Sequence, residues 1–443
     1  MMTSRKTTLL ASAVLLTTAA FAVVACGGSK KPPLEGEREN VIQSIIDLKP
    51  NPKLASLKFK LPKAEDAKAI WPQVGGSPSH IGRHMPLPEK VTKAWDTQVM
   101  GSVSSEEGLT NAPIVADGKL YLMTPGNRVV ALDAWSGDKL WTKDLKQKNG
   151  HKSLRVSGGI ASDNGILYAT TSEGFIYALD GVAGDELWKQ NVKAPVRAAP
   201  TVINGRVFVV THDNRLHVFN AENGNLQWTH SGIEENIAIL GGASVAVDKG
   251  VVVVPYSSGE VYALSTVDGR YLWQETLSGR ANFDPLANLT DIVAAPVIGD
   301  ENVFVANATG QMAALNMKNG RRTWYRDFSA QSTPVVIGNA IYLVTSNNQM
   351  VGLERSTGRI KWVLDLGKKS MKDSDENVIW YGPVLAGGRL FAIASDGYAI
   401  SASPEDGTKI SLVDMKVRAS VPPVVAGSML YFLTDNGRVI AYD

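Results

Sequence analysis

The sequence predicts an all-β protein, an eight-bladed β-propeller of four-stranded antiparallel blades in which an N-terminal strand completes the last blade. Three observations support this prediction. A glycine recurs four residues before a tryptophan, a Gly or Asn recurs ten residues before that glycine, and the final repeat stops one strand short. Self-similarity at a period of roughly 40–50 residues is typical of propellers and solenoids.

The chain begins with a segment typical of a secretory signal peptide. Arg5 and Lys6 form a basic start, and residues 7–24 are apolar and small. This run is short and weakly flanked for a stable membrane span, which needs about 20 apolar residues. We therefore expect residues 1–25 to be removed from the mature protein.

The leader ends at Cys26, the only cysteine of the chain. Residues 23–27 read Val-Val-Ala-Cys-Gly and resemble the lipobox of bacterial lipoproteins, whose cysteine is acylated, for example with palmitate. The resemblance implies several acyl chains on Cys26, and more than one chain anchors a protein stably. Gly27 stands where Asp commonly retains lipoproteins at the inner membrane, which implies the periplasmic face of the outer membrane. The alternative is a chance cysteine in an apolar leader.

The charge balance gives no support for a nucleic-acid partner. Arg5 and Lys6 leave with the leader, so the 45 basic residues fall to 43, equal to the 43 acidic residues. A protein without excess positive charge has no bulk attraction for phosphate backbones.

Residues 26–70 are expected to form the lipidated N-terminus and a flexible linker. They contain Lys-Pro-Pro, Lys-Pro-Asn-Pro and scattered lysines, a composition typical of linkers. The apolar patch at residues 41–46 could also dock as a short helix or strand. Residues 71–443 are expected to form the propeller, with Trp-Pro-Gln-Val-Gly-Gly at 71–76 as a loop across the ring.

Each blade is expected to combine a short inner strand, a tight hairpin and an outer strand that ends in Gly-x-x-x-Trp. The hairpin positions are all Gly or Asn, which accept a positive φ at low cost; they are Asn127, Gly174, Asn214, Gly259, Gly310, Asn348, Gly397 and Gly437. Proline, tolerated at a first strand residue or a bulge, occurs at Pro113, Pro200, Pro296, Pro334, Pro383 and Pro423. The docking tryptophans are Trp141, Trp188, Trp228, Trp273, Trp324 and Trp362, and Ser411 takes the seventh position.

These tryptophans are interpreted as core residues that pack between adjacent blades. Residues at equivalent positions of a repeat serve the repeat itself rather than a ligand. Burial of each ring gives a gross gain of about 4–6 kcal/mol before entropy is subtracted.

The two ends of the propeller are expected to meet in one blade. The last repeat stops at Asp443, in the position of Asp133 and Asp180, and lacks its outermost strand. Residues 92–99, around Trp95, form a tryptophan strand without a repeat of its own. We expect this strand to complete the last blade and to remove open edges, which invite aggregation. An open solenoid is the alternative.

The sequence offers little that indicates catalysis. The spacing of the histidines resembles no metal motif, so we interpret them as polar groups of turns; they are His80, His84, His151, His212, His217 and His230. Residues 372–377 contain three carboxylates that could hold Ca²⁺, but they lack the spacing of an EF-hand loop, which favours a solvated loop. We identify no catalytic, cofactor-binding or metal-binding residue.

The repeat Ala-Leu-Asp-x-x-x-Gly-x-x-x-Trp resembles the tryptophan-docking motif of quinoprotein dehydrogenases, eight-bladed propellers that bind pyrroloquinoline quinone (PQQ). This resemblance implies an alternative function, a PQQ-dependent periplasmic oxidoreductase. Two departures count against it, because that family's catalytic domain is much longer and its disulfide between adjacent cysteines cannot form here. A shared repeat indicates fold, whereas function must be argued from a site. Other ligand-binding propellers are a third class.

The combination of lipobox, linker, Trp-Pro-Gln-x-Gly-Gly entry and eight degenerate repeats resembles the BamB family of lipoproteins, from Cys26 to Asp443. This resemblance implies a non-enzymatic scaffold of the outer-membrane protein assembly machinery, without a cofactor. The implied partners are the POTRA domains of BamA, other subunits of the machinery and unfolded outer-membrane proteins. The long lysine-rich segment before Trp71 departs from the family pattern.

Repeat arrays place function in irregular loops on one face, because the repeated positions are committed to packing. Two loops of consecutive blades stand out, residues 234–242 and the long connection that ends at residues 288–292. In the BamB family these loops form the BamA-binding surface. Matching the segments implies partner contacts for Ile237, Ile239, Leu240 and Asp291.

Two departures and one alternative accompany this site. Leu240 stands where the family often has arginine, and Val293 where it can have a second acid. The alternative places Ile237 and Ile239 in the innermost strand of the fourth blade, facing its core. Alternating apolar residues suit a strand equally well.

Overall fold

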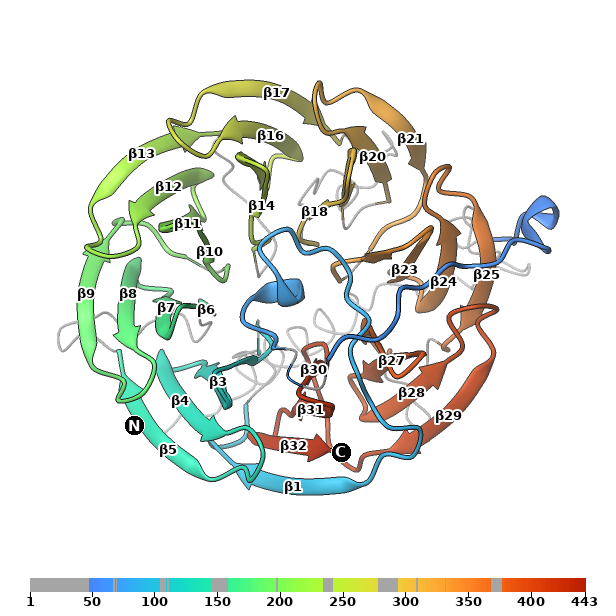
Figure 1. Ribbon diagram of the computed structural model, residues 1–443, viewed down its shortest axis with the longest axis horizontal. Helices are drawn as coiled ribbons and strands as arrows, with labels where there is room; N and C mark the ends of the chain where they lie inside the picture. The colour runs from blue at the N-terminus through green and yellow to red at the C-terminus, as the bar shows by residue number, and fades with distance from the viewer. Residues whose placement is uncertain are drawn as a thin grey trace, which may run out of the picture. The chain divides into compact units, whose positions relative to one another are not determined.

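The computed structural model describes residues 48–66, 68, 70–103, 109, 111–145, 158–196, 198–233, 242–277, 294–307, 310–330, 332–367 and 377–443. Eight four-stranded antiparallel sheets are arranged as blades around a central axis (Figure 1). Seven of them use four consecutive strands, and the eighth combines strands from both ends of the described chain. The predicted eight-bladed propeller is confirmed.

Each blade runs from a short innermost strand to an outer strand at the rim. Blades 1 to 4 are β2 (Ile114–Ala116), β3 (Lys119–Thr124), β4 (Arg128–Asp133), β5 (Lys139–Asp144); β6 (Ile160–Asp163), β7 (Ile166–Thr170), β8 (Phe175–Asp180), β9 (Glu186–Asn191); β10 (Thr201–Ile203), β11 (Arg206–Thr211), β12 (Arg215–Asn220), β13 (Leu226–Ser231); and β14 (Ala246–Asp248), β15 (Val251–Pro255), β16 (Glu260–Ser265), β17 (Tyr271–Thr276). Blades 5 to 8 are β18 (Val297–Ile298), β19 (Asn302–Ala306), β20 (Met312–Asn316), β21 (Arg322–Arg326); β22 (Val335–Ile337), β23 (Ala340–Val344), β24 (Gln349–Glu354), β25 (Ile360–Asp365); β26 (Trp380–Ala386), β27 (Arg389–Ala394), β28 (Tyr398–Ala402), β29 (Lys409–Asp414); and β30 (Val424–Ala426), β31 (Met429–Leu433), β32 (Arg438–Tyr442), β1 (Lys93–Gln98). Two short 3₁₀-helices, η2 (Pro52–Leu54) and η3 (Val74–Gly76), precede β1.

Glycine and asparagine form the hairpins between the second and third strands. All eight predicted positions have a positive φ, from 55° at Asn214 to 128° at Gly310. Five of the six prolines directly precede an innermost strand, and Pro383 lies in β26 where the pairing with β27 is irregular. The turn signals in the sequence therefore fix the boundaries of the strands.

Blade 8 closes the ring as predicted. β1 pairs with β32 along its length, with Trp95 opposite Ala441. Thr92 and Asp443 exchange two backbone hydrogen bonds of 2.9 and 3.0 Å beyond the paired strands. The alternative of an open solenoid is wrong.

Tryptophans of the outer strands connect each blade to the next. Each indole N–H donates at 2.8–3.4 Å to a carbonyl of the following blade, and the pairs are Trp95 to Ala134, Trp141 to Gly181, Trp188 to Ala221, Trp228 to Thr266, Trp273 to Met317, Trp324 to Arg355 and Trp362 to Pro404. The ring also covers a glycine of that blade. A Cβ atom on Gly224, for example, would lie 2.7 Å from the Trp188 ring. The tryptophans therefore pack between blades, as predicted.

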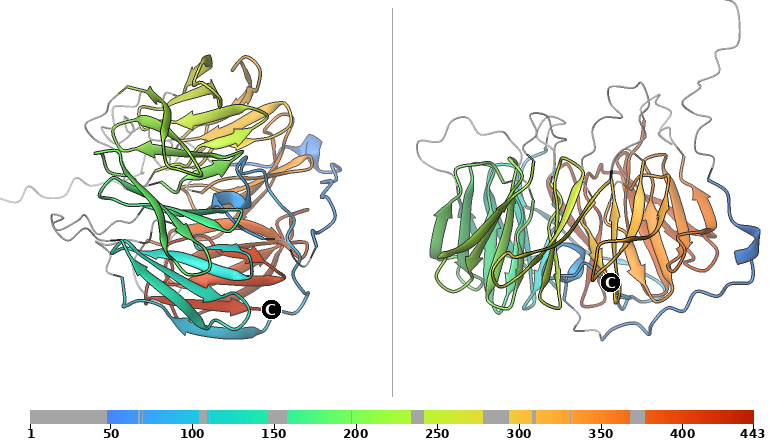
Figure 2. Two further views of the ribbon diagram at one scale, coloured as in Figure 1. Left: turned by 60° about the vertical axis from the view of Figure 1, so that its left-hand side comes forward. Right: turned by 90° about the horizontal axis from the view of Figure 1, so that it is seen from above.

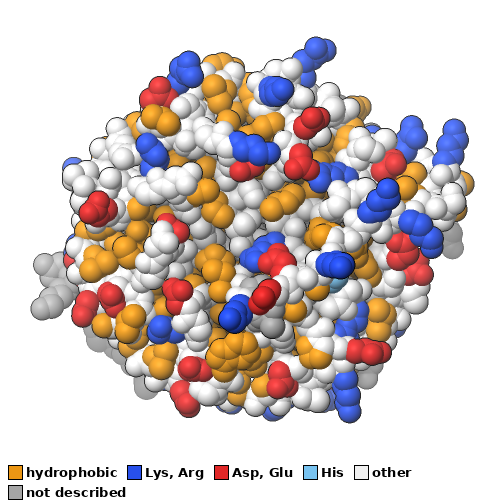
Figure 3. Space-filling model, viewed as in Figure 1, with side chains coloured by type: hydrophobic (Ala, Val, Ile, Leu, Met, Phe, Trp, Pro, Cys, Tyr) orange, Lys and Arg blue, Asp and Glu red, His pale blue; other side chains and the backbone are white. Residues whose placement is uncertain are grey.

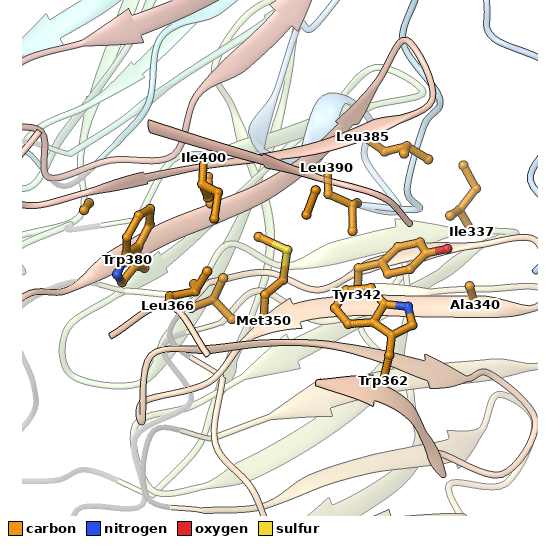
Figure 4. Close-up of a cluster of buried hydrophobic side chains, with 14 of the residues drawn as sticks. Ile337, Ala340, Tyr342, Met350, Trp362, Leu366, Trp380, Leu385, Leu390 and Ile400 are labelled. Atoms are coloured by element: carbon orange, nitrogen blue, oxygen red, sulfur yellow. The ribbon is translucent and has the colours of Figure 1, made fainter. Parts of the chain in front are cut away.

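The core lies between neighbouring sheets. Between blades 6 and 7, Tyr342 stacks on Trp362 with ring centroids 5.9 Å apart, and Met350, Trp380 and Leu385 fill the space beside them (Figure 4). The residue opposite each docking tryptophan is small or β-branched, which leaves room for the indole; these residues are Ala131, Ala178, Val218, Ala263, Ala314, Gly352 and Ala441.

The seam between blades 7 and 8 is built differently. β29 carries Ser411 in place of tryptophan, and Val91 stands four residues before the tryptophan of β1, where other blades have glycine. The chain before β1 covers this seam instead. Met85 is fully buried and bridges to β26, and the Arg389 guanidinium donates to the backbone carbonyls of residues 88 and 89.

Residues 71–85, which we call the central segment, bond to the innermost strands of seven blades in the order of the blades (Figure 1). The bonded pairs are Trp71 with Val115, Pro72 with Ser162, Gln73 with Val202, Pro78 with Val247, Ser79 with Ile298, Gly82 with Val336 and Met85 with Leu385. Innermost strands would otherwise leave backbone groups free at the axis. The expected loop across the ring is confirmed and extends to residue 85.

His80, which the sequence indicated as a polar group of a turn, closes a turn through its N–H to the Ser77 carbonyl and is buried in the central segment. Its side chain is 2% exposed, and Nδ1 lies 2.7 Å from the carbonyl oxygen of Pro296. Burial lowers the pKa of His80 to about 4, against the smaller opposing effect of that hydrogen bond. The imidazole is therefore neutral at pH 7.

Residues 48–70 differ from the expected flexible linker. The compact unit that contains the propeller begins at Leu48, so ordered contacts start before the expected boundary at residue 71. η2 lies beside β25, and the chain then crosses one face of the ring (Figures 1 and 2). Leu54 and Phe59 are buried against the rim, and this apolar burial accounts for the difference.

Candidate partner-binding site

The predicted partner residues lie outside the residues that the structure describes. This applies to Ile237, Ile239 and Leu240 between blades 3 and 4, and to Asp291 between blades 4 and 5. The alternative that Ile237 and Ile239 form the innermost strand of blade 4 is wrong, because that strand is β14. Cys26 also lies outside the described residues.

The last described residue before the first of these loops, Ile233, is held by hydrogen bonds on both sides of its backbone. Its N–H donates to Oε2 of Glu260 at 3.0 Å, and its carbonyl accepts from Nδ2 of Asn214 at 2.6 Å. Its side chain is 59% exposed. The two bonds therefore fix an apolar side chain at the surface where blades 3 and 4 meet.

Glu260 is the centre of this arrangement. It is only 4% exposed, and besides the Ile233 N–H it accepts from the Ser258 hydroxyl at 2.9 Å, the Tyr262 hydroxyl at 3.0 Å and the Gln274 amide at 2.8 Å. A buried carboxylate is tolerated when donors of this kind satisfy its oxygens. Burial, together with the hydrogen bond and charge of Glu260, raises the pKa of Tyr262 to about 12.

Aromatic side chains also pack beside Gly232, the residue before Ile233. His230 Nδ1 lies 2.9 Å from the Tyr256 hydroxyl, and the two rings are nearly parallel, 6.0 Å apart. A Cβ atom on Gly232 would lie 2.4 Å from the Tyr256 ring, so only glycine fits between them. Burial lowers the pKa of His230, which keeps this imidazole neutral at pH 7.

The second loop follows β17 and begins next to the hairpin between β15 and β16, which also contains Glu260. The N–H of Leu277, the last described residue before it, donates to the Gly259 carbonyl at 2.9 Å. Gly259 precedes Glu260, which holds Ile233. The described residues that precede both connections are therefore bonded to one hairpin of blade 4, on the face opposite the turns between first and second strands.

The described residues at this loop base include one exposed apolar side chain, Ile233, and one buried carboxylate, Glu260. Among all residues that the structure describes, no group of three or more His, Cys, Asp or Glu side chains could hold a metal ion. The oxygens of Glu260 are already engaged by donors. Residues 372–376 of the expected Ca²⁺ or solvated loop lie outside the described part of the chain. In that described part, no helix is sufficiently long and apolar to span a membrane.

Sequence reasoning identified Asn214 as a hairpin residue but missed its side-chain bond, and it missed Glu260 and Ile233. A signal for Glu260 was present. The residue after each hairpin position is Arg128, Phe175, Arg215, Glu260, Gln311, Gln349, Tyr398 or Arg438, so Glu260 is the single acid in the series. An acidic residue that occurs in one repeat alone indicates a role that is specific to that blade.

Comparisons with known proteins distinguish the sequence family from the fold. The sequence profile described as "Outer membrane protein assembly factor BamB" matches residues 126–364, more than half of the chain. A profile described as "Glucose/ethanol/alcohol dehydrogenase, beta-propeller domain" matches residues 89–162. BamB of Burkholderia pseudomallei is 26% identical over 382 residues, which cover 85% of this chain and 96% of that relative. Alignments with three further BamB relatives cover 53–68% of their lengths.

Two solved structures share the architecture. BamB from Moraxella catarrhalis superimposes with a TM-score of 0.66 at 19% identity, covering 80% of this chain and all of that one. Quinohemoprotein alcohol dehydrogenase from Comamonas testosteroni gives 0.64 at 14% identity, covering 85% of this chain and 81% of that one. At such identities the likeness shows the fold alone, and the two scores do not separate scaffold from enzyme.

Proposed function

Since this chain belongs to the family of the outer membrane protein assembly factor BamB, we propose that it is a non-enzymatic scaffold of the outer-membrane protein assembly machinery. In this role it binds the POTRA domains of BamA and assists the folding and insertion of β-barrel proteins. The observation that carries the proposal is the family match over residues 126–364, which includes the hairpin and both connections of the candidate site.

The partner surface of this proposal consists of Ile237, Ile239, Leu240 and Asp291. Bonds from one hairpin to Ile233 and Leu277 support it, because they hold the described residues that precede both loops at the same hairpin. A loop base that is already fixed loses less conformational entropy when the loop binds. The exposed side chain of Ile233 adds apolar surface at the described start of the first loop.

The test is the affinity for BamA POTRA domains of a variant with Ile239→Ala and Asp291→Ala. We expect binding to weaken by about 2–4 kcal/mol, as for central anchors of an interface, with an unchanged melting temperature. Val267→Ala is the matched control, because Val267 is exposed in a turn on the opposite face. Wild-type affinity of the double variant per folded molecule contradicts the proposed site. Failure of the wild-type protein to capture BamA from solubilised outer membranes contradicts the proposed function.

We further propose that Cys26 is lipidated and anchors the protein to the periplasmic face of the outer membrane. Cys26→Ser should then move the protein to the soluble periplasmic fraction and leave the propeller folded, because the lipid contributes only membrane affinity. Fractionation of cells that lack the partner checks this outcome. Full membrane retention of Cys26→Ser there excludes the lipobox.

The dehydrogenase propeller profile that matches residues 89–162 makes PQQ-dependent oxidation the second candidate. The residues present do not fit the cofactor site that this resemblance implies, because a chain with one cysteine cannot form a disulfide between adjacent cysteines. Reconstitution with the quinone discriminates the two functions. Retained quinone absorbance together with alcohol-dependent dye reduction would replace the scaffold by an enzyme.

A further inference from the structure

The segment before the propeller follows the rim of blades 6 and 7 in a pattern that suits an extended peptide. We call residues 48–61 the rim strap. Exposure alternates along its end, where Leu57, Phe59 and Leu61 face the protein and Lys58 and Lys60 face solvent. This alternation is the period of an extended chain on an apolar surface.

Phe59 is the anchor of the rim strap. Its ring is buried and meets the ring of Tyr342 edge to face, with centroids 5.6 Å apart. The Lys361 ammonium lies 4.5 Å from the centre of the same ring and is itself paired with the Glu405 carboxylate. The site therefore offers an aromatic wall and a cation to one phenyl ring, both of which attract it.

Two polar side chains recognise the backbone on each side of Phe59. The Glu405 carboxylate accepts from the Phe59 N–H at 3.0 Å. The Asn339 amide accepts from the Lys60 N–H at 2.6 Å and donates to the Lys58 carbonyl at 3.1 Å. We call Asn339, Tyr342, Lys361 and Glu405 the rim socket.

Asn339 and Lys361 of the rim socket differ from the residues at the same positions of most other blades. The first turn ends in glycine in blades 1 to 4, at Gly118, Gly165, Gly205 and Gly250, whereas blade 6 has Gly338 followed by Asn339. A Cβ atom on Gly338 would lie 1.9 Å from the Lys60 carbonyl oxygen, so this glycine makes room for the strap. The position of Lys361 is occupied in the other seven blades by Leu140, Leu187, Gln227, Leu272, Thr323, Ile410 and Ala94.

From these contacts we propose that the rim socket is a docking site for the chain's own rim strap and holds the rim of blades 6 and 7 toward the membrane anchor. The orienting role rests on the proposed anchoring at residue 26, whereas the docking itself does not. Residues 26–48 reach at most roughly 80 Å when fully extended, and residues 26–61 roughly 125 Å. Docking therefore shortens the tether and fixes its exit point at one edge of the ring.

The first test compares the full-length protein with Phe59→Ser by limited digestion with trypsin. Cleavage after Lys58 and Lys60 requires local release of the strap, so we expect it to accelerate roughly tenfold or more in the variant. Ile70→Ser is the matched control, because Ile70 is an exposed apolar residue of the same segment outside the socket. Equal cleavage rates in the wild-type protein and Phe59→Ser overturn the docking.

A labelled synthetic peptide of residues 55–63 tests the socket independently of cleavage. It should bind Phe59→Ser at least about tenfold more tightly than the wild-type protein, whose own strap competes at high effective concentration. Equal binding to both proteins shows that the strap does not occupy the socket and overturns the proposal. Absence of binding to a folded Phe59→Ser protein does the same.

Fluorescence transfer from the propeller to labelled vesicles tests orientation in the lipidated protein. Phe59→Ser should lower the transfer efficiency, because release of the strap lengthens the tether. Unchanged transfer overturns the orienting role. Loss of vesicle binding by the wild-type protein contradicts the anchoring at Cys26 and leaves the socket to be judged by digestion and peptide binding.

Discussion

Each docking tryptophan covers a glycine that must lack a side chain for two reasons, its positive φ and its contact with the indole ring. Gly224 adopts a φ of 73°, which side chains disfavour, and also lies beneath the Trp188 ring. Gly205 in the same blade adopts nearly the same φ of 70° but has no neighbour near its missing Cβ atom. The pair separates the conformational need for glycine from the packing need.

Gly205→Ala should lower the free energy of unfolding by about 1–2 kcal/mol, the cost of the left-handed conformation. Gly224→Ala should lower the free energy of unfolding by about 1–3 kcal/mol more than Gly205→Ala does, because its methyl group must displace the Trp188 ring. Denaturant unfolding of both variants measures the difference. Equal losses of unfolding free energy would mean that the Trp188 ring moves aside without an energetic cost.

The sequence predicted positions well where the backbone conformation restricts the residue type, and poorly where contacts between distant side chains determine the structure. The hairpin residues could be predicted because a positive φ restricts the choice to Gly and Asn. The seven interblade tryptophans followed from their repetition. The hydrogen bond from Ile233 to Glu260 could not be predicted, because it joins residues of different blades and depends on the assembled ring.

At the scale of elements, β1 is the strand whose place is set by the far end of the chain. Its register on β32 packs the partly buried Trp95 against blade 1 and pairs Arg438 with Asp96. The sequence allowed this prediction because the last repeat is one strand short. It did not allow prediction of the rim strap, because single apolar residues in a lysine-rich segment carry no periodic signal long enough to separate docking from a linker.

Deletion of residues 91–99 should therefore lower the free energy of unfolding by about 3 kcal/mol or more, the low end of the cost of removing a large aromatic side chain, because Trp95 is partly buried. It also leaves the edge of β32 unpaired. Thermal unfolding checks the loss, with removal of residues 28–47 as the control that spares every described contact. Similar melting temperatures for both truncations would contradict closure by β1.

At the scale of the whole molecule, the central segment joins seven blades through one stretch of chain. His80 occupies this segment in its neutral form, buried beside blade 5. Its protonation would place an uncompensated charge at the centre of the ring. The histidine thus makes the stability of the ring dependent on pH.

The folded-state pKa of His80, about 4, lies below its unfolded value of 6.5, so the unfolded chain binds more protons between these values. The contribution to stability is complete above pH 6.5 and is lost as the pH falls, by up to about 3 kcal/mol near pH 4. His80→Asn should flatten this decline, because asparagine does not titrate and tolerates the φ of 57° at this position. Unfolding free energies at several pH values measure both slopes, and identical slopes would exclude His80 as the cause.

The closure of blade 8 also constrains the order of folding. Asp96 and Arg438, which meet across β1 and β32, are separated by 342 positions in the chain. Contacts of such long range form late, because the intervening chain must first become compact. During synthesis or export from the N-terminal end, β1 has no partner until the last strands emerge, and its edge stays open for that time. The time needed to complete the ring is then set by the arrival of residues 438–442.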